Sequence, residues 1–125
     1  MNNTEILVKK RVEDILTEIG IPCNLAGYDQ IVTGVFEIRK DPKIRYLVTK
    51  ELYPRIAQKH GTRGSRVERN VRHAIEVGWD RTRPSVVDKY FGNSVSIYRG
   101  KPTNSEFFSQ LYRIINREEE ENEMG

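Results

Sequence analysis

Apolar residues recur three and four positions apart along most of this chain, which is the spacing of amphipathic helices. The first such stretch covers residues 4–19, has Ile6 and Leu7 among its apolar positions, and is followed by Gly20 as a stop signal. The second covers residues 28–40. Its apolar run is short enough to resemble a strand, but spacings of i, i+3, i+4, i+7 and i+8 favour a helix. Both stretches therefore predict helices that bury one face.

The same spacing continues through the rest of the chain. Residues 44–59 form the third expected helix, which Pro54 should either kink or restart, and residues 64–79 form the fourth. A short helix is expected over residues 85–91, followed by an extended stretch over residues 94–98. No internal repeat or low-complexity linker is evident between these elements.

The last expected helix covers residues 104–117. Thr103 and Glu106 have the Ser/Thr-x-x-Glu spacing of a capping box, in which each side chain satisfies an amide at the start of the helix. The acidic residues that follow are expected to form a flexible, solvated tail over residues 118–125. The sequence thus predicts an all-α fold of about six helices, in a single domain that covers residues 1–117.

The segment around Gly61 has the pattern of a helix-turn-helix, with residues 44–59 as its first helix and residues 64–79 as its recognition helix. Ala57 is small enough to permit a close helix crossing, Gly61 accepts a left-handed turn conformation, and Val67 packs the second helix on the first. This pattern points to a nucleic-acid-binding domain.

The expected recognition helix has two different faces when its residues are projected at about 100° each. The apolar and small residues gather on one face: Val67, Val71, Ala74, Ile75 and Gly78. The polar and charged residues gather on the other, with Glu68 at the border: Ser65, Arg66, Arg69, Arg72, His73 and Glu76. Arg offers paired donors to guanine and Glu accepts from the cytosine amine, so this face fits a DNA major groove. The alternative is a solvated surface with internal pairs such as Glu68 with Arg72, but several cations without full pairing favour DNA.

Other residues near this helix are candidates for contacts to the DNA backbone. Lys59 is expected to bind phosphate, and Thr62 is the expected N-cap of the recognition helix. Lys101 is expected either near a phosphate or in solvent. The predicted DNA-binding set is Ser65, Arg66, Glu68, Arg69, Arg72, His73, Lys59, Thr62, Arg63 and Lys101.

Charge is unevenly distributed along the 125 residues, whose net charge is +3. Residues 1–38 carry a net −3, residues 39–83 carry +8, and residues 84–125 carry −2. The basic middle section contains the helix-turn-helix pattern and is typical of a nucleic-acid surface. With 37% hydrophobic residues, the chain has enough apolar material for one small soluble domain with a single core.

Several other classes of protein are disfavoured. Cys23 is the single cysteine, so it forms no internal disulfide, and it is expected as a small buried filler rather than a nucleophile. His60 and His73 stand 13 positions apart without partners at ligand spacing, which argues against a zinc site. Paired carboxylates and catalytic triads are not evident, so we expect neither an enzyme nor a cofactor. The N-terminal residues lack the order of a secretory signal, which favours a cytoplasmic protein.

Six stretches of the chain also resemble a known family. They are Glu18-Ile-Gly-Ile-Pro22, Gly27-Tyr28, Leu52-Tyr-Pro54, Ser65-Arg-Val-Glu-Arg69, Arg72-His-Ala-Ile-Glu-Val77 with Trp79, and Lys101-Pro-Thr-Asn-Ser-Glu-Phe107. Over about residues 10–116, the chain closely resembles the C-terminal DNA-binding effector domain of the stage 0 sporulation response regulator family.

The resemblance implies a mode of DNA recognition and a set of partners. In this family the residues that match Arg66 and Glu68 read base edges, and those that match Arg69, Arg72 and His73 contact bases or backbone. The operator is a box of the TGTCGAA type, often in tandem, on which neighbouring domains meet head to tail. The region that matches residues 84–95 contacts the sigma factor of RNA polymerase.

The resemblance leaves two questions about organisation open. Regulators of this family carry an N-terminal receiver domain that has no counterpart in this sequence, so the chain is either an excised effector fragment or a naturally short relative. A second function is also open, in which the chain is an interaction protein that modulates a full-length sporulation regulator or RNA polymerase and binds DNA only weakly.

Overall fold

The computed structural model describes residues 1–92 and 100–124, which form six α-helices and two short helical turns. The helices are α1 (Asn3–Ile19), α2 (Ala26–Lys40), α3 (Tyr53–His60), α4 (Gly64–Arg81), α5 (Pro84–Tyr90) and α6 (Asn104–Met124), and the turns are η1 (Pro42–Tyr46) and η2 (Val48–Leu52). The described residues contain no strand, so the predicted all-α fold is confirmed. The extended stretch predicted over residues 94–98 lies outside the described residues. None of the described helices is both long and apolar enough to cross a lipid bilayer.

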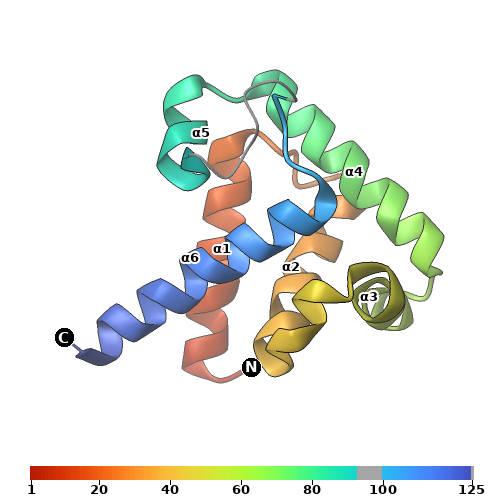
Figure 1. The fold of residues 1–125 in the computed structure, drawn as a ribbon, viewed down its shortest axis with the longest axis horizontal. Coiled ribbons are helices and arrows are strands. Elements are labelled where there is room, and N and C mark those ends of the chain that lie inside the picture. The colour runs from red at the N-terminus through yellow and green to blue at the C-terminus, as the bar shows by residue number, and fades with distance from the viewer. Residues whose placement is uncertain (93–99, 125) are drawn as a thin grey trace.

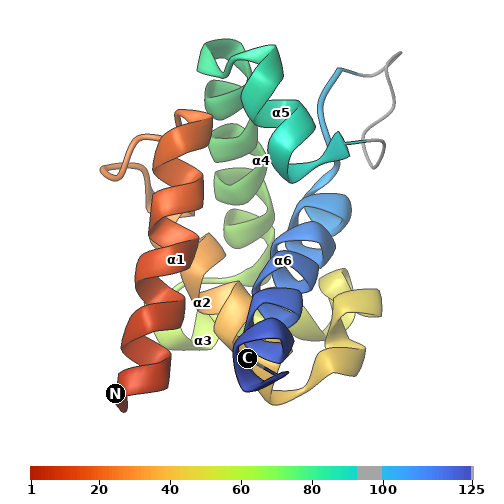
Figure 2. The same ribbon diagram turned by 90° about the vertical axis from the view of Figure 1, so that its left-hand side faces the viewer.

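Helix α2 is the centre of the bundle and contacts α1, α3, α4 and α6. Figures 1 and 2 show these helices around it, with α5 at one end of the molecule. The core that they enclose is formed by aliphatic and aromatic side chains, and those that are completely buried include Ile15, Leu16, Ile31, Val35, Ile56, Val71, Phe107 and Phe108. Because α3 and α4 both pack on α2, the helix-turn-helix is fixed to the body of the domain.

Helix α1 begins at a capping box and matches its predicted range closely. The Asn2 side chain accepts a hydrogen bond from the Glu5 amide at 2.8 Å, which satisfies one of the free amides of the first turn. Two apolar residues of the predicted pattern, Ile6 and Leu7, lie outside the core, since their side chains are 52% and 67% exposed. They lie in the N-terminal part of α1, where Val8 is the first buried hydrophobic residue.

The single helix predicted over residues 44–59 is divided into η1, η2 and α3 in the structure. Leu47 separates the two turns with a non-helical backbone (φ −125°, ψ 48°), and its side chain is 42% exposed. Of the two alternatives expected at Pro54, the restart is the one observed. Pro54 lies in the first turn of α3, where the missing amide hydrogen costs nothing.

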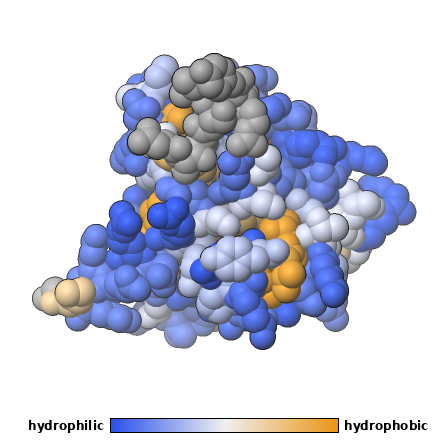
Figure 3. Space-filling model, in the orientation of Figure 1, coloured by the Kyte–Doolittle hydropathy of each residue, from blue (hydrophilic) through white to orange (hydrophobic). Residues whose placement is uncertain are grey.

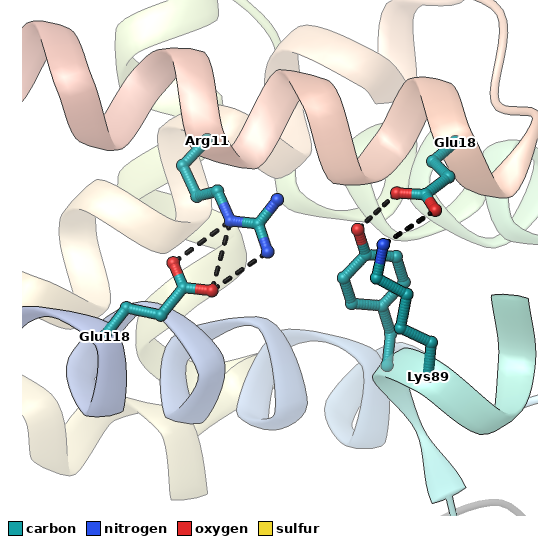
Figure 4. Close-up of polar contacts among 5 residues, drawn as sticks. Arg11, Glu18, Lys89 and Glu118 are labelled. Atoms are coloured by element: carbon teal, nitrogen blue, oxygen red, sulfur yellow. Dashed lines mark hydrogen bonds and ion pairs between the residues drawn. The ribbon is translucent and has the colours of Figure 1, made fainter. Parts of the chain in front are cut away.

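Two further expectations about burial and order are corrected. Cys23 is exposed rather than a buried filler, because the turn between α1 and α2 directs Ile21 into the core and leaves Cys23 at the surface. The acidic tail expected from residue 118 is instead part of α6, which continues to Met124. Its first two glutamates pair with other helices: Glu118 with Arg11 of α1 and Glu119 with Arg39 of α2, both at 2.9 Å. Figure 4 shows the first of these pairs.

The surface on the α6 side of the molecule is mostly hydrophilic. Figure 3 shows small, separate apolar areas among charged and polar side chains on this face. Large hydrophobic side chains are exposed singly or in small groups, at Met1, Ile6, Leu7, Tyr46, Leu47 and Met124. Scattered exposure of this kind is normal for a folded domain and does not by itself indicate an interface.

Candidate nucleic-acid interface

Helices α3 and α4 form the predicted helix-turn-helix. Gly61 has a positive φ of 64°, which is the left-handed conformation expected for it, and it ends α3. Ile56, Ala57 and Val67 are all buried where the two helices meet. The helix predicted over residues 64–79 is confirmed, and α4 runs slightly further, to Arg81.

Thr62 is not the N-cap of α4, contrary to the prediction. Its backbone amide donates to the carbonyl oxygen of Ala57 at 3.0 Å, so Thr62 belongs to the turn that ends α3. The cap position falls to Arg63, whose backbone is extended and whose side chain makes no capping hydrogen bond. Backbone hydrogen bonds therefore satisfy the end of α3, and the start of α4 has no side-chain cap.

The two faces of α4 lie as the helical projection predicts. Val67, Val71 and Ala74 are completely buried, and Ile75 is nearly so. The residues of the opposite face are exposed: Ser65, Arg66, Arg69, Arg72 and His73. Figure 1 shows α4 along one edge of the molecule, with α3 beside its N-terminal end. The cationic side chains are therefore accessible to a large, flat partner.

Some charges of this surface are paired and others are not. The guanidinium of Arg72 donates to the carboxylate of Glu68, one turn earlier. This is the internal pair that a solvated surface predicts. Among residues 1–92 and 100–124, no carboxylate forms an ion pair with Arg63, Arg66 or Arg69. An exposed pair one helical turn apart contributes only about 0.3 to 0.5 kcal/mol, so a phosphate group can readily compete with it.

Lys59 and Lys101 each have a carboxylate partner. Nζ of Lys59 lies 3.4 Å from the carboxylate of Glu37, which is only 7% exposed and also pairs with Lys40. Lys101 pairs with Glu76 of α4 at 3.4 Å. Both lysines keep about half of their side-chain surface exposed, so each is held in place and still accessible.

Asn104 and Tyr53 are two residues of this region that sequence reasoning did not select. Nδ2 of Asn104 donates to the Tyr53 hydroxyl at 2.9 Å and to the backbone carbonyl of Glu68 at 3.0 Å. Burial raises the pKa of the Tyr53 phenol, and the hydrogen bond from Asn104 partly opposes this. The capping box of Thr103 and Glu106, which is confirmed, places Asn104 at the start of α6. Only the fold brings it beside α4.

A groove with a volume of about 460 Å³ lies between α4 and the start of α6. Its charged and polar walls include Tyr53, Glu68, Arg72, Glu76, Lys101 and Asn104. In the described part of the chain, no group of His, Cys, Asp or Glu side chains is arranged to hold a metal ion. The groove thus continues the exposed surface of α4 onto α3 and the segment that opens α6.

The comparison with known families agrees with this geometry. Residues 12–115 match the family described as "Sporulation initiation factor Spo0A C terminal". The matched range begins within α1 and ends within α6, and includes the whole helix-turn-helix. Members of this family are DNA-binding domains of sporulation regulators and are not enzymes. The chain therefore belongs to the family of Spo0A C-terminal domains.

Proposed function

We propose that this chain is a sequence-specific transcription regulator that places α4 in the major groove of a TGTCGAA-type box. The observation that carries the proposal is the orientation of α4, with its apolar face buried and its arginine-rich face exposed. A helix of this kind fits the width of the major groove of B-form DNA. The family to which the chain belongs supports the same function.

Under this proposal the residues divide into base readers and backbone contacts. Arg66 donates two hydrogen bonds to a guanine, and Glu68 accepts one from a cytosine. Arg69, Arg72 and His73 contact bases or phosphates. The backbone is bound by the polar and basic residues around them: Ser65, Lys59, Thr62, Arg63 and Lys101. The cations without a carboxylate partner supply most of the salt-dependent affinity.

A fluorescence-anisotropy titration tests the proposal. The purified chain is titrated against a duplex that carries the box and against a scrambled duplex, at several salt concentrations. We expect a preference for the box of about tenfold or more, which corresponds to about 1.4 kcal/mol. Equal and strongly salt-dependent binding to both duplexes would show electrostatic binding without sequence specificity. Absence of binding to either duplex would overturn the proposal.

A second candidate is an interaction protein that acts on a full-length sporulation regulator or on RNA polymerase. The observation behind it is that Arg72, Lys59 and Lys101 each have a carboxylate partner, and a protein partner would leave these ion pairs intact. Binding of the purified chain to a full-length regulator, with no binding to either duplex, would support this alternative.

Two partner contacts extend the main proposal. The sigma factor of RNA polymerase would bind residues 84–95, of which residues 84–92 are described and include the exposed side chains of Ser85 and Asp88. Asp88→Arg should then abolish activation in a reconstituted transcription assay and leave DNA binding intact. Neighbouring copies would meet head to tail on tandem boxes, which predicts cooperative binding that is lost when the spacing between the boxes changes.

A further inference from the structure

The segment that opens α6 contacts α4 at two points. Nδ2 of Asn104 donates to the carbonyl oxygen of Glu68 at 3.0 Å, and Lys101 pairs with the carboxylate of Glu76 at 3.4 Å. Glu68 and Glu76 are eight positions apart, or about two turns of helix. Residues 101–104 therefore lie along the recognition helix and support it at two levels.

Asn104 connects three helices through one atom. An amide NH2 group has two hydrogens, and Asn104 donates to both the Glu68 carbonyl of α4 and the Tyr53 hydroxyl of α3. These partners are 36 and 51 positions away in the sequence. Asn104 is partly buried, whereas its neighbours Thr103 and Ser105 are exposed. The amide thus links the two helices of the helix-turn-helix to α6.

The Glu68 backbone is the point at which this link reaches the predicted base-reading residues. The direction of the Glu68 side chain follows from the position of its own peptide unit, and its carboxylate holds the guanidinium of Arg72. Base readout requires that such groups be held to within about 0.5 Å of the productive geometry. A change in the rotation of α4 would therefore move both side chains relative to the DNA.

We propose, resting on the DNA-binding function proposed above, that Asn104 is a positioning residue for sequence recognition. By holding the Glu68 carbonyl and the Tyr53 hydroxyl together, it sets the rotation of α4 against α3 and so the direction in which Glu68 and Arg72 meet the bases. Asn104 touches no base itself. Its effect on DNA is exerted through the helix that it holds.

The substitution Asn104→Asp tests this role selectively. Aspartate has nearly the same shape and is favourable in the first turn of a helix, so α6 should still form. The Tyr53 hydroxyl can donate to the new carboxylate, whereas the Glu68 carbonyl has no hydrogen to donate. The matched control is Ser105→Asp, which adds the same charge at the adjacent exposed position and leaves both hydrogen bonds of Asn104 intact.

Both variants and the unmodified chain are titrated against a panel of duplexes in which each base pair of the box is changed in turn. We expect Asn104→Asp to lower discrimination at one or two adjacent base pairs by about fivefold or more. Ser105→Asp should weaken binding to all duplexes alike and keep the pattern of discrimination. A purely structural role for Asn104 would lower affinity or stability without changing that pattern. Discrimination in Asn104→Asp that stays within about twofold of the unmodified chain at every position would overturn the proposal.

Hydrogen exchange provides a second readout that needs no DNA. The Arg72 amide donates to the Glu68 carbonyl within α4, so loosening of this carbonyl should speed its exchange by about threefold or more relative to amides near the end of the helix. If the unmodified chain prefers the box but exchange of the Arg72 amide is unchanged in Asn104→Asp, the positioning role of Asn104 is overturned and the proposed DNA-binding function stands. A chain without any preference for the box would instead overturn the proposed function, and the recognition role of Asn104 with it.

Discussion

Arg11 on α1 and Glu118 on α6 form a two-pronged ion pair across the molecule. Nε and Nη2 of Arg11 donate to the carboxylate at 2.9 to 3.1 Å, and the guanidinium lies 5.7 Å from the centre of the Tyr90 ring (Figure 4). The hydrogen bond to Glu118 raises the pKa of the Arg11 guanidinium above its ordinary value. One side chain thereby joins α1, α5 and α6.

We expect this pair to contribute modestly to stability. Both side chains are about one-third exposed, so solvent screening limits the coupling energy in a double-mutant cycle of Arg11→Ala and Glu118→Gln to about 0.5 to 1 kcal/mol. Urea denaturation at low and high salt measures it. Glu121→Gln is the control, because Glu121 is an exposed glutamate on the same helix with no ion pair among the described residues. A coupling energy between Arg11 and Glu118 that is no larger than the change in unfolding free energy caused by Glu121→Gln would contradict a stabilising ion pair.

The contact between α1 and α5 should make stability depend on pH at the acid end. The Tyr90 hydroxyl and Lys89 both donate to the Glu18 carboxylate (Figure 4), and these hydrogen bonds lower the pKa of Glu18 below its ordinary value of 4.5. A carboxylate with a lowered pKa in the folded state stabilises the protein above its unfolded pKa, and this contribution is lost as the pH falls through the folded pKa.

Glu18→Gln removes that titration. The difference in free energy of unfolding between the unmodified chain and Glu18→Gln should therefore be constant near neutral pH and shrink below about pH 4.5. Tyr90→Phe should have the same effect in part, because the Tyr90 hydroxyl is the main cause of the lowered pKa. Urea denaturation from about pH 7 to about pH 3 measures both. Parallel pH profiles for all three proteins would exclude this role for Glu18.

Two glycines of α4 should respond oppositely to alanine. A Cβ atom at Gly78 would lie 2.6 Å from Cγ1 of the buried Ile21, so Gly78→Ala should destabilise the protein by about 1 to 3 kcal/mol. At Gly64 the nearest atom would be Cβ of Tyr53 at 3.5 Å, an ordinary contact. Gly64→Ala should therefore stabilise by about 0.4 to 1 kcal/mol, because the unfolded chain loses conformational freedom. Thermal denaturation of the two variants compares them directly, and changes of the same sign would refute the packing argument.

Arg66 and Lys59 should affect DNA binding in different ways. Arg66→Ala should cost about 1 to 3 kcal/mol and relax the preference at one guanine, since an arginine that reads guanine is worth this much in discrimination. Lys59→Ala should weaken binding to all sequences alike and lower the salt slope by about 1, as expected for a phosphate contact. A binding selection on randomised duplexes distinguishes them. An unchanged site preference in Arg66→Ala would show that it is not a base reader, and an altered preference in Lys59→Ala would overturn its assignment to phosphate.

The Lys59 variant needs a stability measurement beside the binding assay. Lys59 pairs with the nearly buried carboxylate of Glu37, so its removal leaves that carboxylate with Lys40 as its partner. Removing one partner of a buried charge is destabilising. If the binding defect disappears when the data are corrected for the folded fraction, its cause is the loss of the Lys59–Glu37 ion pair and not the loss of a phosphate contact.

Local rules were sufficient for most of the secondary structure and for the faces of α4. The spacing of Val67, Val71, Ala74 and Ile75 determines which side of this helix is buried, and the arginines then necessarily occupy the other side. Gly61 as a left-handed turn and the capping box of Thr103 with Glu106 also follow from local chemistry. These features depend on residues within one or two helical turns of each other, so the sequence by itself determined them.

Tertiary contacts decided the remainder, because they join residues that no local pattern relates. The acidic run after residue 117 is helical in the structure, with Glu118 and Glu119 paired to arginines of α1 and α2. Leu47 and Cys23 are exposed because the chain changes direction at each of them. The position of Asn104 beside Glu68 exists only after α3, α4 and α6 have packed together. The sequence determined what α4 presents to a partner, and packing across the fold decided how rigidly it is held.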